Sequence, residues 1–367
     1  MTSTWLMLER SPDGQRAPHV ARLESVGRRL PAARLTTDEL MASTRHRTKI
    51  DLERLTGIHE RRVSDGRENS LTLAASAAAD CLSRSRHRPE DLEVVVSCSI
   101  TKYRDDLVQW LEPPMSVAVA QSIGATNAVT FDVANACAGM LTGVFVLANQ
   151  IRRGEISCGM AVSGEYISQL GVNAAAHVRS ILSRELASLT LGDAGAAVIV
   201  ERAPAGKPGI DVAGFTTVSQ HSRLCRAYPA RRDRGARMFT RARTIHQVAI
   251  ADMPFLLREA LDAAGLEMGD IDYVIPHQTS ARAIRKGMGE ICDALGDTPR
   301  NPAVVTVDRY GNTASTTHFV ALVEELQAGR LHAGDRVALV ALASGLEIGF
   351  VLFTVDEELV GAYGHDD

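Results

Sequence analysis

Two stretches of this 367-residue chain repeat the same order of elements far apart in the sequence. Residues 71–87 are rich in alanine and predict a helix, and residues 88–100 follow as a turn and an apolar, β-branched strand. Residues 248–265 predict a second helix, and residues 266–280 a second turn and apolar strand. Nearly continuous apolar strands between helices are typical of parallel sheets covered on both faces. We therefore expect an α/β fold.

A second pair of segments extends this similarity. Residues 155–165 and 334–349 each predict a buried strand that ends at Ser-Gly, and a Pro- and Gly-rich stretch at 201–209 separates the two sets. These patterns predict one module used twice, with halves at 1–203 and 204–367. The alternative is two unrelated α/β segments that look alike because buried strand–helix units share one pattern.

A cysteine stands in the stretch TFDVANACAGM, residues 130–140. The residues before Cys137 predict a strand and those after it a helix, so Cys137 is expected at or just before a helix N-terminus. There the helix dipole and free N–H groups should lower the thiol pKa. Ala136, Ala138 and Gly139 should leave room for a substrate beside the sulfur. The alternative is an inert thiol packed in the core.

A thiolate nucleophile needs a partner that exchanges protons with it or polarises its substrate. His277 follows an apolar strand that breaks at Pro276, and Asn312 lies in a Gly-Asn turn before another helix. Both are predicted at junctions between elements, where functional loops concentrate. His318 is a competing histidine that we rank lower.

Composition excludes several classes of protein. The net charge of −4 gives no reason to expect a nucleic-acid partner. The sequence contains no run of about 18 apolar residues, so it does not predict a membrane span. Six widely spaced cysteines without a C-x-x-C pair give neither a zinc ribbon nor a disulfide framework. The N-terminal residues lack a signal-peptide pattern, so we expect a reduced, cytoplasmic setting.

A basic stretch at 223–243 holds eight arginines and one aspartate. Its guanidinium groups suit the phosphates of coenzyme A or the acidic face of an acyl carrier protein. The alternative is a solvated loop whose charges bind nothing specific.

Four motifs together resemble the ketoacyl synthase III branch of the thiolase-fold condensing enzymes. They are DVANACAGM, PHQTSARAI, YGNTASTT and LASGLEIG, and LTGIHERR and LTLGDAGAAVIV are two further landmarks in the family's order. The resemblance extends from about residue 18 to about residue 354. It implies a five-layered αβαβα thiolase fold built from two similar halves. It also implies a homodimer, or a heterodimer with a homologue.

The resemblance assigns roles to residues of this chain. Cys137 would carry an acyl group as a thioester, while His277 and Asn312 would bind the carbonyl of the second thioester. The backbone N–H groups of Cys137 and Gly345 would form the oxyanion hole. The acyl donor would be an acyl-CoA or the phosphopantetheine of an acyl carrier protein, with no permanently bound cofactor and no metal.

Candidate substrate-binding arginines come from two places. Arg282 matches a family position near coenzyme A, and Arg226 and Arg231 belong to the basic stretch. The chain also departs from the family pattern. Ser280 replaces an asparagine that often follows the catalytic histidine, and Leu55 replaces an arginine. The glycine-rich oxyanion loop keeps only its last glycine, at residue 345.

One stretch, SITKYRDDLVQWLEPPM, is similar to the OleA-type enzymes that join two acyl-CoA chains head to head. The resemblance implies that Glu112 reaches the partner subunit's site and removes the α-proton, which an acyl group without a carboxylate to lose requires. A carboxylate in an apolar tunnel would be a stronger base. The predicted reaction is therefore a Claisen condensation of two acyl thioesters to a β-ketoacyl product.

Three alternatives stay open. The first is a decarboxylative ketoacyl synthase III that uses malonyl-carrier protein. The second is an acyltransferase to a hydroxyl or an amine in secondary metabolism. The third is a non-catalytic subunit that only shapes a heterodimer, which the presence of Cys137, His277 and Asn312 disfavours.

Overall fold

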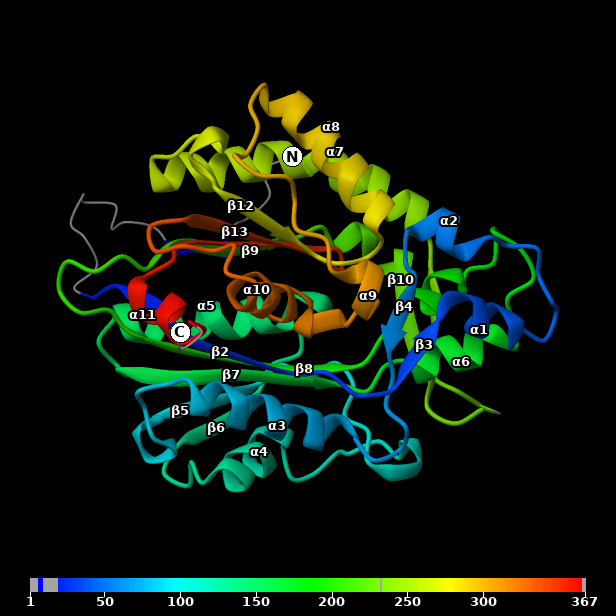
Figure 1. Ribbon diagram of the computed structural model, residues 1–367, viewed down its shortest axis with the longest axis horizontal. Coiled ribbons are helices and arrows are strands. Elements are labelled where there is room, and N and C mark those ends of the chain that lie inside the picture. Colours follow the sequence, from blue (N-terminus) through cyan, green and yellow to red (C-terminus); the bar gives the residue numbers. More distant parts are fainter. Residues whose placement is uncertain (1–5, 9–18, 232, 365–367) are drawn as a thin grey trace.

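The computed structural model describes residues 6–8, 19–231 and 233–364. Its elements form five layers, with two sheets that enclose a central layer of helices and further helices on the outer faces (Figure 1). This is the αβαβα arrangement expected from the sequence. The strands of the first sheet, in spatial order, are β2 (Ala21–Arg29), β8 (Ala194–Arg202), β7 (Cys158–Glu165), β5 (Val94–Ser97) and β6 (Val129–Asp132).

The second sheet repeats most of this order. Its strands are β1 (Leu6–Met7), β9 (Ile210–Thr217), β14 (Glu347–Thr354), β13 (Arg336–Ala343) and β12 (Tyr273–Pro276). In β2-β8-β7-β5 and in β9-β14-β13-β12 alike, the first two pairings are antiparallel and the third is parallel. This common pattern supports one module used twice, although β1 from the first half joins the second sheet.

The expectation of parallel sheets is only partly right. Both sheets are mixed. In the second sheet, β13 and β14 are joined by a turn at 344–346, and a connection that short allows only an antiparallel pair. The helices predicted at 71–87 and 248–265 are α3 (Ser70–Ser83) and α7 (Ala242–Ala264).

The central layer consists of α5 (Gly139–Arg152) and α10 (Thr317–Gln327), and each contacts both sheets. Helices α3 and α4 (Met115–Ile123) cover the outer face of the first sheet. Helices α7 and α8 (Ala281–Leu295) lie over the second sheet (Figure 1). The largest apolar cluster lies between the sheets and includes Phe319 and Val144, neither of which is exposed.

Smaller elements gather at one end of the molecule (Figure 1). They are β3 (Arg34–Thr36), α1 (Thr37–Ala42), α2 (Leu52–Thr56), β4 (Glu60–Arg62), α6 (Gln169–Ala175), β10 (Cys225–Pro229), β11 (Ala236–Thr240) and α9 (Val307–Tyr310). A short helix α11 (Glu357–Gly361) follows β14. None of the helices in the described part of the chain is long and apolar enough to cross a membrane.

Short 3-10 turns complete the described chain. They are η1 (Pro89–Asp91), η2 (Asp105–Leu107), η3 (Ala136–Ala138), η4 (Leu186–Thr190), η5 (Ser219–Leu224), η6 (Met268–Asp270) and η7 (Ala314–Thr316). Two of them, η3 and η7, contact each other beneath the end of β13 and begin the central helices. These contacts place the predicted nucleophile and the predicted amide donor in neighbouring segments.

Candidate active site

Cys137 lies in η3, between the end of β6 and the start of α5. The residue before it, Ala136, has φ +43°, a left-handed conformation that is uncommon for a residue with a side chain. Asn135 ties this turn to the helix, because its Nδ2 donates a hydrogen bond to Thr142 Oγ1 at 2.8 Å. Cys137 as a residue is only partly buried.

The small neighbours of Cys137 have a different purpose from the one predicted. Ala138 is 1% exposed, and a Cβ at Gly139 would lie 2.7 Å from the carbonyl oxygen of Cys98. A Cβ at Gly143, one turn later, would lie 2.7 Å from the Cys98 sulfur. The small residues therefore let α5 pack closely against the end of β5, and they do not open a space beside the sulfur.

The predicted lowering of the thiol pKa is also wrong for the unliganded site. Removal of water from the sulfur raises the pKa of Cys137, and the nearby Cys225 and Glu165 raise it further, while its own backbone N–H acts in the opposite direction. The apolar residues beside the sulfur include Ile167, Leu170 and Leu191. Desolvation in this apolar setting outweighs the effect of the helix start.

His277 comes directly after β12, as predicted. Its N–H donates to the carbonyl oxygen of Val340 at 2.8 Å, and its side chain is 6% exposed. Burial, with a smaller contribution from His318, lowers the pKa of His277 to about 3. The imidazole is therefore neutral at pH 7 and suits a hydrogen-bonding role toward a thioester carbonyl.

The competing histidine, His318, lies next to the predicted one. The two rings are 5.9 Å apart between centroids, and His318 Nε2 is 3.0 Å from the same Val340 carbonyl oxygen. Burial lowers the pKa of His318 to about 4, so both rings are neutral. The His318 ring lies beside His277 and the backbone of β13, so His318 belongs to the surroundings of the predicted catalytic histidine.

Backbone hydrogen bonds fix the position of Asn312. Its N–H donates to Thr190 O at 2.8 Å, and its carbonyl oxygen accepts from Gly192 N at 3.0 Å. Its side-chain Oδ1 accepts from Ala314 N at 2.9 Å, which leaves the NH₂ group as the donor of the side chain. Because η7 contacts η3, this donor belongs to the segment beside Cys137.

Gly345 is the middle residue of the turn between β13 and β14 and has φ +140°, a value that only glycine adopts without strain. The end of β13 also contacts η3, so the loop of Gly345 and the loop of Cys137 are neighbours. The structure thus brings together the four segments that carry Cys137, His277, Asn312 and Gly345.

A buried carboxylate links these segments. Glu165, at the end of β7, accepts from Ile100 N at 2.8 Å, from Thr101 Oγ1 at 2.9 Å and from Ser315 Oγ at 2.5 Å. Burial raises its pKa in spite of these donors. Sequence analysis did not single out Glu165, and its role here is to hold the loop after β5 and the turn η7 in place.

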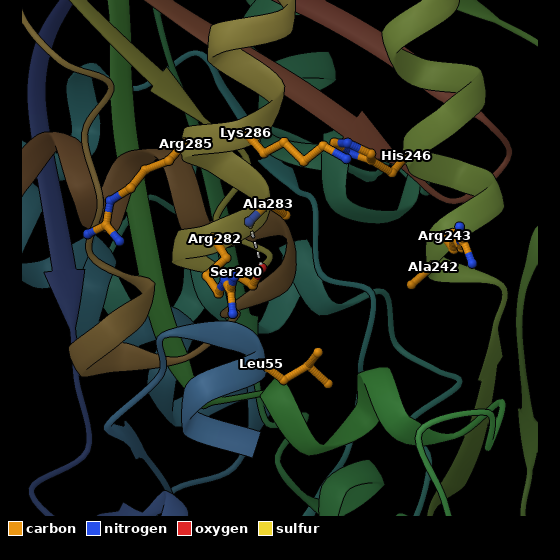
Figure 2. A pocket seen from close by; sticks show the side chains of 9 residues that line it. All are labelled: Leu55, Ala242, Arg243, His246, Ser280, Arg282, Ala283, Arg285 and Lys286. Carbon is orange, nitrogen blue, oxygen red and sulfur yellow. Dashed lines mark hydrogen bonds between the residues drawn. The ribbon is translucent and has the colours of Figure 1, made fainter. Parts of the chain in front are cut away.

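A cavity of about 680 Å³ opens where α8 faces the start of α7 and α2 (Figure 2). Four cationic side chains line it, and Arg282 Nη1 also donates to the carbonyl oxygen of Arg54 at 2.8 Å. Ser280 caps α8 by accepting from Ala283 N at 3.0 Å and lines the same cavity. The four cationic residues are Arg243, Arg282, Arg285 and Lys286.

The chain resembles proteins of known family along most of its length. Residues 131–220 match the family model of 3-oxoacyl-[acyl-carrier-protein] synthase III, and residues 261–355 match the model of its C-terminal region, together about half of the chain. A β-ketoacyl-[acyl-carrier-protein] synthase III of Symbiobacterium thermophilum is 29% identical over 82% of this chain and 92% of its own length. The corresponding protein of Acidiphilium cryptum is 28% identical over 90% and 98%. The chain belongs to the ketoacyl synthase III-like condensing enzymes of the thiolase superfamily.

Solved structures give the same fold for this condensing enzyme. OleA of Xanthomonas campestris, solved with lauric acid and lauroyl-CoA, superposes with a TM-score of 0.79 at 24% identity, over 92% of this chain and 99% of that one. The 3-oxoacyl-[acyl-carrier-protein] synthase III of Aquifex aeolicus gives a TM-score of 0.77 at 24% identity, over 91% and 100%. The predicted thiolase fold is therefore confirmed, and the condensing enzyme is an acyltransferase.

Of the three arginines predicted to bind substrate, only Arg282 lines the cavity of this condensing enzyme. Arg226 and Arg231 are exposed in a hairpin formed by β10 and β11, away from the lining residues. Their stretch folds because other arginines in it make ion pairs: Arg237 is bidentate to Glu185 at 2.7 and 2.8 Å. The substrate-binding role of Arg226 and Arg231 stays a prediction.

Two cavity cations, Arg285 and Lys286, were missed by sequence analysis. Their spacing from Arg282, three and four residues, puts all three on one face of α8, and this signal was available in the sequence. Among the described residues, no group of three His, Cys, Asp or Glu side chains is arranged to hold a metal ion.

Glu112 lies in the exposed loop before α4. Its neighbour Leu111 is 76% exposed, while Trp110 is 9% exposed and donates through Nε1 to Pro113 O at 2.6 Å. The structure of one chain therefore does not bring Glu112 to Cys137 or into an apolar tunnel. Burial of this carboxylate would need a second subunit.

Proposed function

We propose that the enzyme condenses two acyl thioesters through a covalent intermediate on Cys137. In the first step the sulfur attacks a thioester carbonyl, the carbon–sulfur bond to coenzyme A or carrier protein breaks, and the thiol proton passes to the leaving thiolate. In the second step a base removes an α-proton from the other acyl thioester. The resulting carbon attacks the acyl-cysteine, Cys137 leaves as a thiolate and is reprotonated, and a β-ketoacyl thioester is released.

The observation that carries this proposal is that the turn of Cys137 contacts the turn that follows Asn312, while His277 ends β12 as a neutral imidazole. Cys137, His277 and Asn312 come from three segments at neighbouring strand ends, and burial keeps the imidazole uncharged. A neutral imidazole and an amide NH₂ both suit a carbonyl oxygen that becomes an enolate. The N–H groups of Cys137 and Gly345 are the proposed oxyanion hole.

The cationic cavity is the proposed docking site for the phosphates of coenzyme A or of carrier-protein phosphopantetheine. Four cationic side chains are among the residues that line it, and its volume of about 680 Å³ suits a cofactor-sized ligand (Figure 2). It lies at the N-terminal end of α8, a few residues after His277, so a ligand bound there could extend its thioester toward the sulfur. Guanidinium groups bind phosphates bidentately.

We further propose a homodimer in which Glu112 acts in the partner's site. Strand β6 is an edge of the first sheet, and its Val129 is 65% exposed. Asp132, at the end of the same strand, accepts from Ser116 N at 3.0 Å and so ties the loop of Glu112 to this edge. An edge strand with exposed apolar side chains favours pairing with another chain.

A second candidate function is decarboxylative condensation with malonyl-carrier protein. The names of the relatives in Symbiobacterium thermophilum and Acidiphilium cryptum favour it, and the same sulfur, imidazole and amide would serve both reactions. In that reaction the loss of carbon dioxide creates the carbanion, so Glu112 would not be needed. Either reaction would belong to lipid or polyketide biosynthesis. Six free cysteines fit a reduced, cytoplasmic setting for both.

Product analysis separates the two reactions. The purified enzyme is incubated with acyl-CoAs of several chain lengths, alone and with malonyl-carrier protein, and products are identified by mass spectrometry. We expect β-ketoacyl products that contain both acyl chains when only acyl-CoA is supplied. Products that form only with malonyl-carrier protein, with release of carbon dioxide, would support the second function.

A further inference from the structure

A second, smaller cavity lies among β3, β4 and α6. Its volume is about 130 Å³, and its wall is mostly apolar. One lining residue, Leu191, also belongs to the apolar cluster against which Cys137 packs. Another, Val172, is 51% exposed, so the cavity reaches the surface.

The guanidinium of Arg61 in β4 lines this cavity without a counter-charge. Arg61 is 1% exposed, and no carboxylate in residues 6–8, 19–231 and 233–364 forms an ion pair with it. Nη1 donates to Leu35 O at 3.3 Å and Nη2 to Thr37 Oγ1 at 3.1 Å, while Nε has no hydrogen-bond partner. Burial lowers the pKa of Arg61 to about 10, so the group stays charged at neutral pH.

The other polar residues of the cavity are largely committed to partners. Ser64 Oγ donates to Glu68 O, and Ser168 Oγ donates to Asp193, each at 2.7 Å. Asp193 already accepts from several N–H groups. The free donors at the cavity are therefore those of Arg61 and the amide of Gln169, whose one hydrogen bond is 3.5 Å long.

An uncompensated buried cation is costly, and a guanidinium fork matches a carboxylate in both shape and charge. We propose that this cavity is a carboxylate-binding site formed by Arg61. The carboxylate is either a free small acid or the far end of an acyl group carried by Cys137. The second source, which rests on the proposed function, would make ω-carboxyacyl thioesters a substrate class of the enzyme, because the apolar cluster beside Cys137 shares Leu191 with the wall of this cavity.

The first test measures binding alone. The melting temperature of the full-length protein is followed with increasing sodium acetate or formate, against sodium chloride at the same ionic strength. We expect a saturable rise in melting temperature with carboxylate in the wild type and no such rise in Arg61→Gln. Gln169→Leu should show a weakened rise. This second variant keeps the test decisive if Arg61→Gln does not fold. The double variant Arg282→Gln/Lys286→Gln should keep the rise, because it alters only the larger cavity.

The second test compares acylation of Cys137 by glutaryl-CoA and pentanoyl-CoA, which have the same chain length. A wild-type preference of tenfold or more for glutaryl-CoA, lost in Arg61→Lys and reduced in Gln169→Leu, would identify the acyl group as the source of the carboxylate. A melting-temperature response without this preference would identify a free acid. Absence of both effects would overturn the proposal. If no acyl-CoA acylates Cys137, the proposed function fails while the first test still decides on the carboxylate site.

Discussion

At the scale of single residues, the chemistry depends on a sulfur in an uncharged setting. The pKa of the Cys137 thiol is raised by desolvation, and the pKa of His277 is lowered by the same cause. Both groups are therefore neutral in the empty enzyme near pH 7, and an ion pair between them is not the resting state. The thiol must lose its proton during the attack on the thioester.

This setting predicts the pH dependence of alkylation at Cys137. A raised thiol pKa means that the thiolate fraction is small at pH 7 and grows about tenfold with each pH unit until the pKa is reached. The rate of iodoacetamide labelling at Cys137, followed by peptide mass spectrometry, should therefore keep rising beyond pH 9. Labelling of the Cys137→Ser variant gives the background from other thiols. A plateau below pH 8 would show that the helix start lowers the pKa after all.

Residue-level sequence analysis located these groups but not their charge. Cys137, His277 and Asn312 follow predicted strands or turns, and such positions can be found from hydrophobic patterns and motifs. The direction of the Cys137 pKa shift depends on which apolar side chains surround the sulfur, among them Leu191, and on Glu165. These neighbours come from distant parts of the chain, so local sequence does not reveal them.

At the scale of elements, the site depends on loops that pass very close to one another. Gly311 precedes Asn312 with φ +71°, and a Cβ there would lie 2.8 Å from Arg61 Cβ and 2.9 Å from Thr190 O. Gly265 has a similar φ of +68° but has open space around it. The two glycines differ in ψ as well: Gly265 has ψ 37°, in the left-handed helical region, while Gly311 has ψ −176°, a combination that essentially only glycine adopts.

We predict different costs for alanine at these two positions. Gly265→Ala should lower the free energy of unfolding by roughly 1–2 kcal/mol through backbone strain alone. Gly311→Ala should lower it by a further 1–3 kcal/mol or so, because of overlap and of a backbone conformation that only glycine adopts, and should also slow condensation by displacing Asn312. Urea unfolding and initial rates measure both effects. Equal losses of stability would mean that the Gly311 loop can move away without cost.

The elements themselves were predictable where the apolar pattern is long. Helix α3 and strand β5 match their predicted positions closely, and the similarity between halves reappears in the strand order. The hairpin of β10 and β11 was not predicted, because its strands are short, polar and rich in arginine. Its stability comes from contacts such as Arg237 with Glu185, which are remote in sequence.

At the scale of the whole molecule, the proposed reaction requires a second subunit, because a single chain leaves Glu112, the proposed base, exposed. Glu112 is exposed beside the β6 edge, so under this proposal the base must come from a second copy. Each active site would then combine Cys137 of one subunit with Glu112 of the partner subunit. This arrangement predicts that two inactive variants can complement each other in a mixed dimer.

Mixed dimers test this arrangement. Glu112→Gln should accept an acyl group on Cys137 but not condense it, and Cys137→Ser should do neither. Unfolding and refolding the two variants together should restore condensation to about a quarter of the wild-type rate per subunit, because half of the dimers are mixed and each has one intact site. Each variant refolded alone serves as the control. No recovery, with dimers confirmed by light scattering, would place the base in the same chain as Cys137. Condensation by Glu112→Gln refolded alone would show that Glu112 is not needed.

The account as a whole depends on a covalent acyl group at Cys137. Intact-mass spectrometry after incubation with an acyl-CoA measures it directly, with peptide mapping to locate the adduct. We predict one acyl group per chain, on Cys137 and not on the neighbouring Cys225, and no adduct in Cys137→Ser. An unmodified wild-type protein that still makes product, or an adduct on another residue, would contradict the account.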